Sequence, residues 1–501
     1  MIVKWMANFA QPIGALLLIL GSQWAGVPAS AQTQKTPPAT QPICPAQLPD
    51  AIDAIANRPQ FSRARWGILV EPLSPTDGQT LYNRQGEDYF IPASNEKLLT
   101  TAAALAKLGT QFRIRTSVYG TPVNGGEVSL RVVGRGDPSL TDSHLASLAQ
   151  QLKSRGIRQV GQMVVEDGYF QGQPVNPNWE WEDVQAGYGA PVNSLIVNEN
   201  AINLTLSPQA AGQPLRVTWD DPKEARGWRV ENDSVTVGPN EPEFLEVGRD
   251  FSRPILRIKG QLRAGAEPEE VAVAIVNPAE NFLQRFQQAL AAEGIAVGRA
   301  QIAAGTPTAG EVELAAVESP PLSELVMKTN QESNNLYAEV LLRSLGTVAK
   351  ADAAMAGKDT ADAGLEAIKA TLTQLGVNAE SYVPEDGSGL SRHNLVSPEA
   401  LVQTLRAMAN SAAAEIYQTS LPVAGVSGTL TYRFRDTTAQ GIVQAKTGTV
   451  TGVSALSGYA RPLNYPPLVF SIIVNQSHQS AGQQRQAIDE IVLLLTRLRS
   501  C

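Results

Sequence analysis

Runs of apolar residues near the two ends of the chain predict strands. Residues 66–70 (Trp-Gly-Ile-Leu-Val) and 79–83 flank a segment that contains two prolines and a glycine, a pattern typical of a hairpin. Near the other end, three apolar runs separated by glycine, asparagine and proline predict strands at residues 441–450, 453–461 and 468–475.

Between these strands the apolar residues recur at helical spacing. Residues 94–108 show this periodicity, and Gly109 follows as a stop signal. Four further helices are predicted, at residues 322–345, 362–375, 397–410 and 480–497. Because strands at both ends enclose helices, the pattern predicts one α+β domain.

The middle of the chain has a different character. Residues 113–320 contain short strand-like runs punctuated by Gly, Pro and Asn, with one predicted helix at residues 281–293. We therefore expect a catalytic-type domain built from residues 45–112 and 321–501, interrupted by a β-rich insert at 113–320. The strand-like runs lie at residues 128–133, 162–166, 202–206 and 271–275.

The N-terminus is typical of an export signal. Lys4 precedes an apolar run at residues 13–20, and Ala29-Ser30-Ala31 offers small residues for cleavage. A membrane-spanning helix is the alternative, but the run is much shorter than the roughly 20 residues that span a bilayer. We predict a signal peptide at 1–31, a flexible leader at 32–44, no stable membrane span after cleavage, and a periplasmic location.

The composition of the chain argues against some classes of partner and some kinds of catalytic site. With 501 residues, 43% of them hydrophobic and 18% charged, the chain is typical of a folded multidomain protein. A net charge of -8 gives no attraction for nucleic acid, and three His and two Cys cannot assemble a zinc site. No metal or other cofactor is expected. Cys44 and Cys501 could form a disulfide between the chain ends or remain unpaired thiols.

Ser94 and Lys97 are the first candidates for chemistry. They lie three residues apart at a predicted helix start, so their side chains project from the same face. A lysine can accept the proton of a hydroxyl only when desolvation or a nearby cation lowers its pKa. Ser94 could instead be a simple helix cap, but a capping box would require Glu or Gln where Lys97 stands.

Two further motifs carry polar groups. Ser333 and Asn335 could relay a proton and hold a substrate carbonyl, although alone they could be an ordinary helix start. In Lys446-Thr447-Gly448, a cation and a hydroxyl can meet an anion, and the glycine permits close approach to the backbone. The alternative is an exposed edge strand protected by a lysine.

The order of the three motifs changes this assessment. Ser-x-x-Lys, Ser-x-Asn and Lys-Thr-Gly each occur once, in that order, on the elements that their chemistry requires. The set resembles the penicillin-binding, serine-acylating superfamily, and the long interval from Ser94 to Ser333 resembles its D-alanyl-D-alanine carboxypeptidase/endopeptidase family (penicillin-binding protein 4 type, peptidase family S13). Five outer runs fit the same family, at residues 136–140, 188–191, 386–392, 421–425 and 428–430.

The resemblance implies a fold and a set of catalytic roles. The fold would be a penicillin-binding, serine β-lactamase-like transpeptidase domain, with an antiparallel sheet flanked by helices. Ser94 would attack the carbonyl of the penultimate D-alanine and form an acyl-enzyme, and Lys97 would take its proton. Ser333 would pass that proton to the leaving amine, while Asn335 would bind the substrate backbone.

The same resemblance implies how the substrate is held. Lys446 and Thr447 would bind its terminal carboxylate beside Gly448. The backbone N–H groups of Ser94 and Thr449 would stabilise the oxyanion.

Four other residues belong to the outer runs or lie near them. The resemblance implies that Asp183 and Tyr188 line a pocket for the side-chain amine of diaminopimelate, although Asp183 could equally be a solvated loop acid. Ser388 and Arg392 lie in a Gly-rich turn, where local turn chemistry is sufficient to account for them.

The implied function is an exported serine carboxypeptidase, and an endopeptidase on cross-links. Its substrates would be peptidoglycan peptides ending in D-Ala-D-Ala, and β-lactams would inhibit it covalently. Alternatives are a β-lactamase or esterase on the same core, or a catalytically silent wall-binding protein. A Ser-His-Asp hydrolase is disfavoured, because His144, His393 and His478 have no Gly-x-Ser-x-Gly motif beside them.

Overall fold

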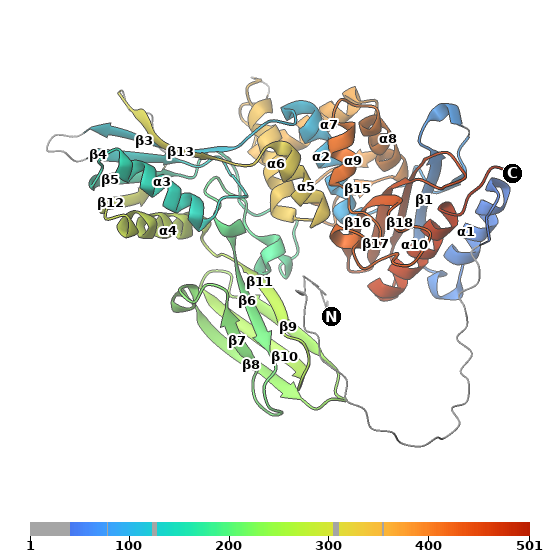
Figure 1. The fold of residues 1–501 in the computed structure, drawn as a ribbon, viewed down its shortest axis with the longest axis horizontal. Coiled ribbons are helices and arrows are strands. Elements are labelled where there is room, and N and C mark those ends of the chain that lie inside the picture. Colours follow the sequence, from blue (N-terminus) through green and yellow to red (C-terminus); the bar gives the residue numbers. More distant parts are fainter. Residues whose placement is uncertain (1–40, 78, 123–127, 304–309, 353–354) are drawn as a thin grey trace, which may run out of the picture.

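The computed structural model describes residues 41–77, 79–122, 128–303, 310–352 and 355–501. The predicted signal peptide and residues 32–40 of the predicted leader lie outside the described residues. Within the described ranges, no helix is both long enough and apolar enough to cross a membrane. Figure 1 shows a body of sheet and helices that contains both ends of these ranges, and two smaller bodies formed by the middle of the chain.

The first and last parts of the chain share one antiparallel sheet. Its strand order is β16-β17-β18-β1-β2, so the predicted strands from both ends lie side by side. Strand β1 pairs with β18 from Arg65 opposite Asn475 to Pro72 opposite Leu468. The bounds are Arg65–Pro72 for β1, Tyr82–Arg84 for β2, Val443–Val450 for β16, Val453–Ala460 for β17 and Leu468–Asn475 for β18.

Helices cover both faces of this sheet. On one face, α1 (Leu48–Ala56) and α10 (Ala481–Leu495) pack against Ile68 and Val70 of β1. On the other face, α2 (Glu96–Leu108) and α8 (Pro398–Ala409) lie over Leu69. Because both faces are buried, the strands appear in the sequence as continuous apolar runs rather than as alternating patterns.

The predicted helix at 322–345 is wrong in one respect, because the chain breaks within it. Helix α5 (Leu322–Gln331) ends before Ser333, whose φ of +58° is left-handed, and α6 (Asn335–Ala349) begins directly after it. The Asn334 side chain caps α6 by accepting a bond from Tyr337 N at 3.1 Å. Apolar spacing continues through the break, so periodicity alone could not reveal it.

The remaining helices and strands of this body lie between α6 and β16 in the chain. Helix α7 (Thr360–Gln374) matches its prediction closely, whereas α9 (Ala414–Ser420) had no clear signal. A two-stranded ribbon of β14 (Tyr382–Val383) and β15 (Leu395–Val396) flanks the loop at residues 386–392.

The middle of the chain forms two further bodies. The first is a mixed five-stranded sheet in the order β12-β5-β4-β3-β13, with a core shared by α3 and α4. Helix α3 was not predicted. The bounds are Arg115–Pro122 for β3, Val128–Val133 for β4, Gln159–Glu166 for β5, Ala296–Ile302 for β12, Val312–Glu318 for β13, Asp142–Ser154 for α3 and Pro278–Ala292 for α4.

The second of these bodies, called here the β-body, contains residues 201–274. Two three-stranded sheets, in the orders β8-β10-β9 and β11-β6-β7, share a core that includes Leu204 and Ile258. The domain boundaries at 112/113 and 320/321 stay predictions. The bounds are Ala201–Ser207 for β6, Arg216–Trp219 for β7, Arg229–Val237 for β8, Phe244–Arg249 for β9, Ile255–Arg263 for β10 and Glu269–Ala274 for β11.

Cys44 and Cys501 form a disulfide across 457 positions of the chain, with their Cα atoms 5.8 Å apart. Beside it, Ile43 N donates to Arg497 O at 3.0 Å and Arg499 N donates to Ile43 O at 3.1 Å. The covalent link and this short bridge therefore join the segment before α1 to the segment after α10.

We predict that Cys44→Ser/Cys501→Ser lowers the free energy of unfolding by about 3 to 5 kcal/mol, since the unfolded chain regains the entropy of a very long loop. Urea denaturation followed by circular dichroism measures this change. Reduction of the wild type should reproduce it, whereas superimposable curves for the oxidised wild type and the double variant would contradict it.

Candidate active site

Ser94 lies in a 3-10 turn, Ala93–Asn95, immediately before α2. The turn is held against the sheet because Asn95 Nδ2 donates to Ser457 Oγ of β17 at 2.8 Å. Just upstream, Ile91 N donates to Asn475 Oδ1 of β18 at 2.8 Å. These two attachments position the half-buried Ser94 hydroxyl at the N-terminal end of a helix that is buried from Glu96 to Leu105.

Lys97 lies one turn further along and is fully buried. Its Nζ atom is 2.9 Å from Ser94 Oγ, 2.6 Å from Asn335 Oδ1 and 2.6 Å from the carbonyl oxygen of Ser388. Burial lowers the pKa of Lys97 to about 7, although nearby carboxyl groups, including Glu339, act to raise it. A large fraction of Lys97 is therefore neutral near neutral pH.

The three contacts of Lys97 determine where its lone pair points. Asn335 Oδ1 and Ser388 O can only accept, so they take the two hydrogens of a neutral amine. The lone pair then faces the third partner, the Ser94 hydroxyl. The predicted pair of nucleophile and base is thus brought together in a geometry that permits proton transfer from Oγ to Nζ.

Ser333 meets the third motif on the opposite side of the site. Lys446 Nζ donates to Ser333 Oγ at 2.8 Å and to Thr447 O at 2.9 Å. Lys446 is fully buried, and burial followed by the proximity of Lys97 holds its pKa well below the ordinary value. The helix break at Ser333 is what turns its side chain toward the strand β16.

Gly448 allows β16 to pass very close to Ser94. A Cβ atom at this position would lie 2.7 Å from Pro92 O and 3.2 Å from Ser94 N, so a larger residue would push the strand away. β16 is an edge strand of the sheet, and next to Gly448 the Thr447 hydroxyl lies 2.8 Å from Thr429 Oγ1. Backbone and hydroxyl groups of β16 are therefore available beside Ser94.

The loop that carries the Ser388 carbonyl is organised by Asp386. Its fully buried carboxylate accepts bonds from Gly389 N and Ser391 N at 2.7 Å and from Trp179 Nε1 at 2.8 Å. Gly389 has a φ of +81° and packs against Ala93. The sequence predicted only turn chemistry for Ser388, and its backbone contact with Lys97 was missed.

Two buried carboxyl groups behind Lys97 were also missed. Glu339 accepts from Gly387 N at 2.9 Å, and burial together with repulsion from Asp386 raises its pKa to about 7. Glu96 is fully buried and its carboxyl oxygens have no hydrogen-bond partner among the described residues. Burial raises the pKa of Glu96 well above its ordinary value, which favours the protonated form. In the sequence, the one signal of this burial is that Glu96 lies between Ser94 and Lys97 in the Ser-x-x-Lys motif.

Asp183 and Tyr188 also reach the site. Asn335 Nδ2 donates to the backbone carbonyl of Tyr188 at 2.9 Å, and the Tyr188 hydroxyl donates to Asp183 Oδ1 at 2.9 Å. Burial raises the pKa of Asp183 above its ordinary value. Nearby, Arg392 forms an ion pair with Glu180 at 2.8 Å. The middle of the chain therefore supplies one wall of the site.

Comparison with known proteins identifies the family of this chain. The model of the D-Ala-D-Ala carboxypeptidase 3 (S13) family matches residues 48–498. The chain belongs to this S13 family. A D-alanyl-D-alanine carboxypeptidase from an Actinomadura species is 36% identical over 448 residues, covering 86% of this chain and 81% of the relative. The penicillin-sensitive carboxypeptidase A of Dictyostelium discoideum is 30% identical over 466 residues, covering 86% and 87%.

The S13 fold is seen in a solved structure as well. Penicillin-binding protein 4 from Haemophilus influenzae superposes with a TM-score of 0.74 at 24% identity, covering 89% of this chain and 98% of that one. The match confirms the predicted α+β, penicillin-binding type of fold. Membership of the S13 family makes the chain a hydrolase of the D-Ala-D-Ala carboxypeptidase class.

The pKa of Lys97 predicts how the reactivity of Ser94 depends on pH. Because the pKa is lowered to about 7, the neutral base predominates above that pH and is lost as the pH falls through it. We expect the rate constant for acylation of Ser94 by a penicillin to fall roughly tenfold per pH unit below about pH 7. Stopped-flow fluorescence between about pH 5 and pH 9 measures it.

Circular dichroism at each pH is the control that the chain stays folded over this range. A rate constant that is the same at every pH would show that Lys97 is not the group that accepts the proton.

Proposed function

We propose that this protein is an exported serine-type D-alanyl-D-alanine carboxypeptidase that acts on peptidoglycan stem peptides through an acyl-enzyme on Ser94. We propose that it also cleaves D-alanyl cross-links as a D,D-endopeptidase. The observation that carries the proposal is the 2.9 Å contact between Ser94 Oγ and the buried amine of Lys97, whose pKa burial lowers to about 7.

Acylation begins with proton transfer from Ser94 to Lys97. As the Oγ–H bond breaks, Oγ forms a bond to the carbonyl carbon of the penultimate D-alanine, and the carbonyl oxygen becomes an oxyanion. The backbone N–H groups of Ser94 and Thr449 stabilise that oxyanion, a contribution of about 3 kcal/mol for one such donor in other enzymes. The close approach of β16 at Gly448 supports this pairing of donors.

The leaving group takes its proton on the other side of the site. Ser333 receives a hydrogen bond from Lys446 and passes its hydroxyl proton to the nitrogen of the terminal D-alanine as the C–N bond breaks, and the proton that Lys97 took from Ser94 replaces it on Ser333. Water then attacks the acyl carbon and gives a proton to the again neutral Lys97; as the ester C–O bond breaks, Ser94 Oγ takes that proton and the shortened peptide is released. Asn335, which contacts Lys97, also binds the substrate backbone.

The amine of Lys446 and the hydroxyl of Thr447, both on β16, select a substrate that ends in a free carboxylate. Lys446 and Thr447 bind this carboxylate, with Thr447 oriented by its contact with Thr429. In a cross-link the same carbonyl is attacked, but the leaving amine belongs to the side chain of a neighbouring stem peptide. Asp183 and Tyr188 accommodate the side-chain amine of diaminopimelate at the third position of the peptide.

Two other lines support the proposal. A relative that is 30% identical is named as penicillin-sensitive, which agrees with covalent capture of Ser94 by β-lactams. The predicted signal peptide delivers the protein to the periplasm, where peptidoglycan is found, and a disulfide between Cys44 and Cys501 suits an oxidising compartment.

We predict that fluorescent penicillin labels the mature wild-type protein and that Ser94→Ala abolishes labelling, because the variant lacks the attacking oxygen. In-gel fluorescence after denaturation measures the covalent adduct. Ser139→Ala is a control, since Ser139 donates to Asp137 rather than to the groups around Lys97. Equal labelling of wild type and Ser94→Ala would overturn the assignment of the nucleophile.

Mass spectrometry of purified muropeptides distinguishes the possible reactions. We expect wild type to remove one D-alanine from pentapeptides and to convert cross-linked dimers to monomers, while Ser94→Ala leaves both unchanged. A protein that hydrolyses penicillin within seconds and leaves muropeptides intact would be a β-lactamase. One that retains muropeptides without cleaving them would be a binding protein.

A further inference from the structure

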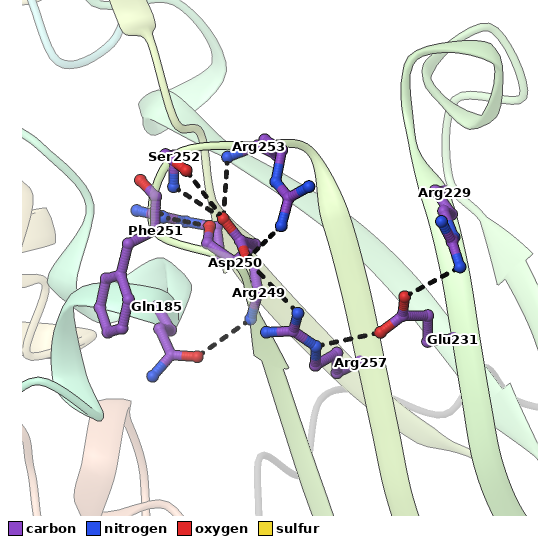
Figure 2. Close-up of polar contacts among 9 residues, drawn as sticks. All are labelled: Gln185, Arg229, Glu231, Arg249, Asp250, Phe251, Ser252, Arg253 and Arg257. Atoms are coloured by element: carbon purple, nitrogen blue, oxygen red, sulfur yellow. Dashed lines mark hydrogen bonds and ion pairs between the residues drawn. The ribbon is translucent and has the colours of Figure 1, made fainter.

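Arg249, at the end of β9, uses its guanidinium to bind backbone carbonyls of two separate segments. The side chain is only 5% exposed. Its Nη1 donates to Asp250 O at 2.9 Å and to Phe251 O at 3.4 Å, and its Nη2 donates to Val184 O at 3.0 Å. The cluster around it is drawn in Figure 2. A buried cation held by carbonyl oxygens joins the β9–β10 turn to the segment that carries Asp183 and Tyr188.

Further contacts strengthen this junction. Gln185 Oε1 accepts a bond from Arg249 N at 3.1 Å, as Figure 2 shows. Gly248 leaves room for the Gln185 side chain, because a Cβ there would lie 2.6 Å from Gln185 Oε1. The rings of Trp181 and Phe251 lie 6.1 Å apart between their centroids. The turn itself is shaped by Asp250, which accepts from Ser252 N at 3.1 Å.

The segment that Arg249 holds has little regular structure of its own. Residues 183–189 form two successive 3-10 turns, Asp183–Gln185 and Gly187–Gly189. A single bridge pairs Ala186 with Val273 of β11. These two attachments, Arg249 and β11, come from the β-body, so the β-body holds the segment from the side opposite to Asn335.

The far end of the segment makes contact with the catalytic groups. Tyr188 O accepts from Asn335 Nδ2 at 2.9 Å, which fixes the amide so that Oδ1 faces Lys97. If this carbonyl moved, the amide could rotate and present Nδ2 to Lys97. The Nδ2 hydrogens of Asn335 would then face the hydrogens of the Lys97 amine. The lone pair of Lys97 would no longer be directed at Ser94.

We propose that Arg249 is a positioning residue for acylation: by fastening residues 183–189 to the β-body, it keeps the Tyr188 carbonyl on Asn335 and thereby orients Lys97 toward Ser94. This inference rests on the proposed function, because its kinetic test uses acylation of Ser94. A residue remote from the reacting atoms thus controls the orientation of the base.

The kinetic test compares Arg249→Met with wild type during acylation by fluorescent penicillin. We expect the first-order acylation rate constant to fall about 5- to 10-fold, the effect of losing one orienting hydrogen bond. The dissociation constant of the initial, non-covalent complex should stay within about twofold, because β16 still binds the carboxylate. Arg249→Lys should recover part of the rate, since an ammonium can still donate to the carbonyls.

Arg253→Gln is the matched control. Arg253 lies on the same turn, but its side chain is 68% exposed and pairs with Asp250 rather than with Val184. Its acylation rate constant should equal that of wild type. If Arg249→Met does not fold, Gln185→Ala provides a milder variant that removes the acceptor for Arg249 N and should slow acylation about 2- to 3-fold.

Hydrogen–deuterium exchange tests the anchor without using activity. Amides of the segment such as Ala186 N and Gly189 N, which donate within its turns, should exchange faster in Arg249→Met but not in Arg253→Gln. Unchanged exchange would overturn the anchor, and faster exchange with an unchanged acylation rate constant would overturn its coupling to Lys97. Failure of penicillin to label wild type would instead contradict the proposed function, and the exchange result would still stand.

Discussion

The candidate active site depends on one arrangement: the amine of Lys97 is buried away from water, and the hydroxyl of Ser94 lies beside it. Burial favours the neutral amine, and buried carboxyl groups that would oppose this are themselves driven toward their neutral forms, as at Glu96 and Glu339. The local environment therefore favours the neutral amine of Lys97 near neutral pH. Ser94 stays partly exposed because it lies in the turn before α2 rather than within the helix.

Three backbone positions of unusual geometry lie at the candidate active site. Ser333 occupies a left-handed position between two helices, Gly389 has a positive φ beneath Ala93, and Gly448 brings an edge strand against the Ser94 backbone. Such local departures from regular structure are found where a site must place groups precisely. The sheet and its covering helices provide the rigid frame that keeps these departures in place.

The inserted bodies contribute to the site as well as enlarging the protein. Their segment at residues 183–189 covers one side of the catalytic groups, and its backbone carbonyl at Tyr188 selects the orientation of the Asn335 amide. In the proposed mechanism, proton transfer depends on this contact between the body that contains both chain ends and the middle of the chain. The long interval between Ser94 and Ser333 therefore contains the segment that contacts Asn335.

The sequence by itself determined the strands of the sheet shared by the two ends of the chain, some of the strands in the middle, most of the helices and the three motifs, because apolar periodicity and residue chemistry are local properties. It also indicated Asp183 and Tyr188, through resemblance rather than through physical pattern. Only the tertiary structure decided that the helix at 322–345 breaks at Ser333, that Cys44 meets Cys501, and that backbone carbonyls at 188 and 388 orient Asn335 and Lys97. A carbonyl is present at every residue, so its role depends on which distant segments are packed together, and no local pattern records that.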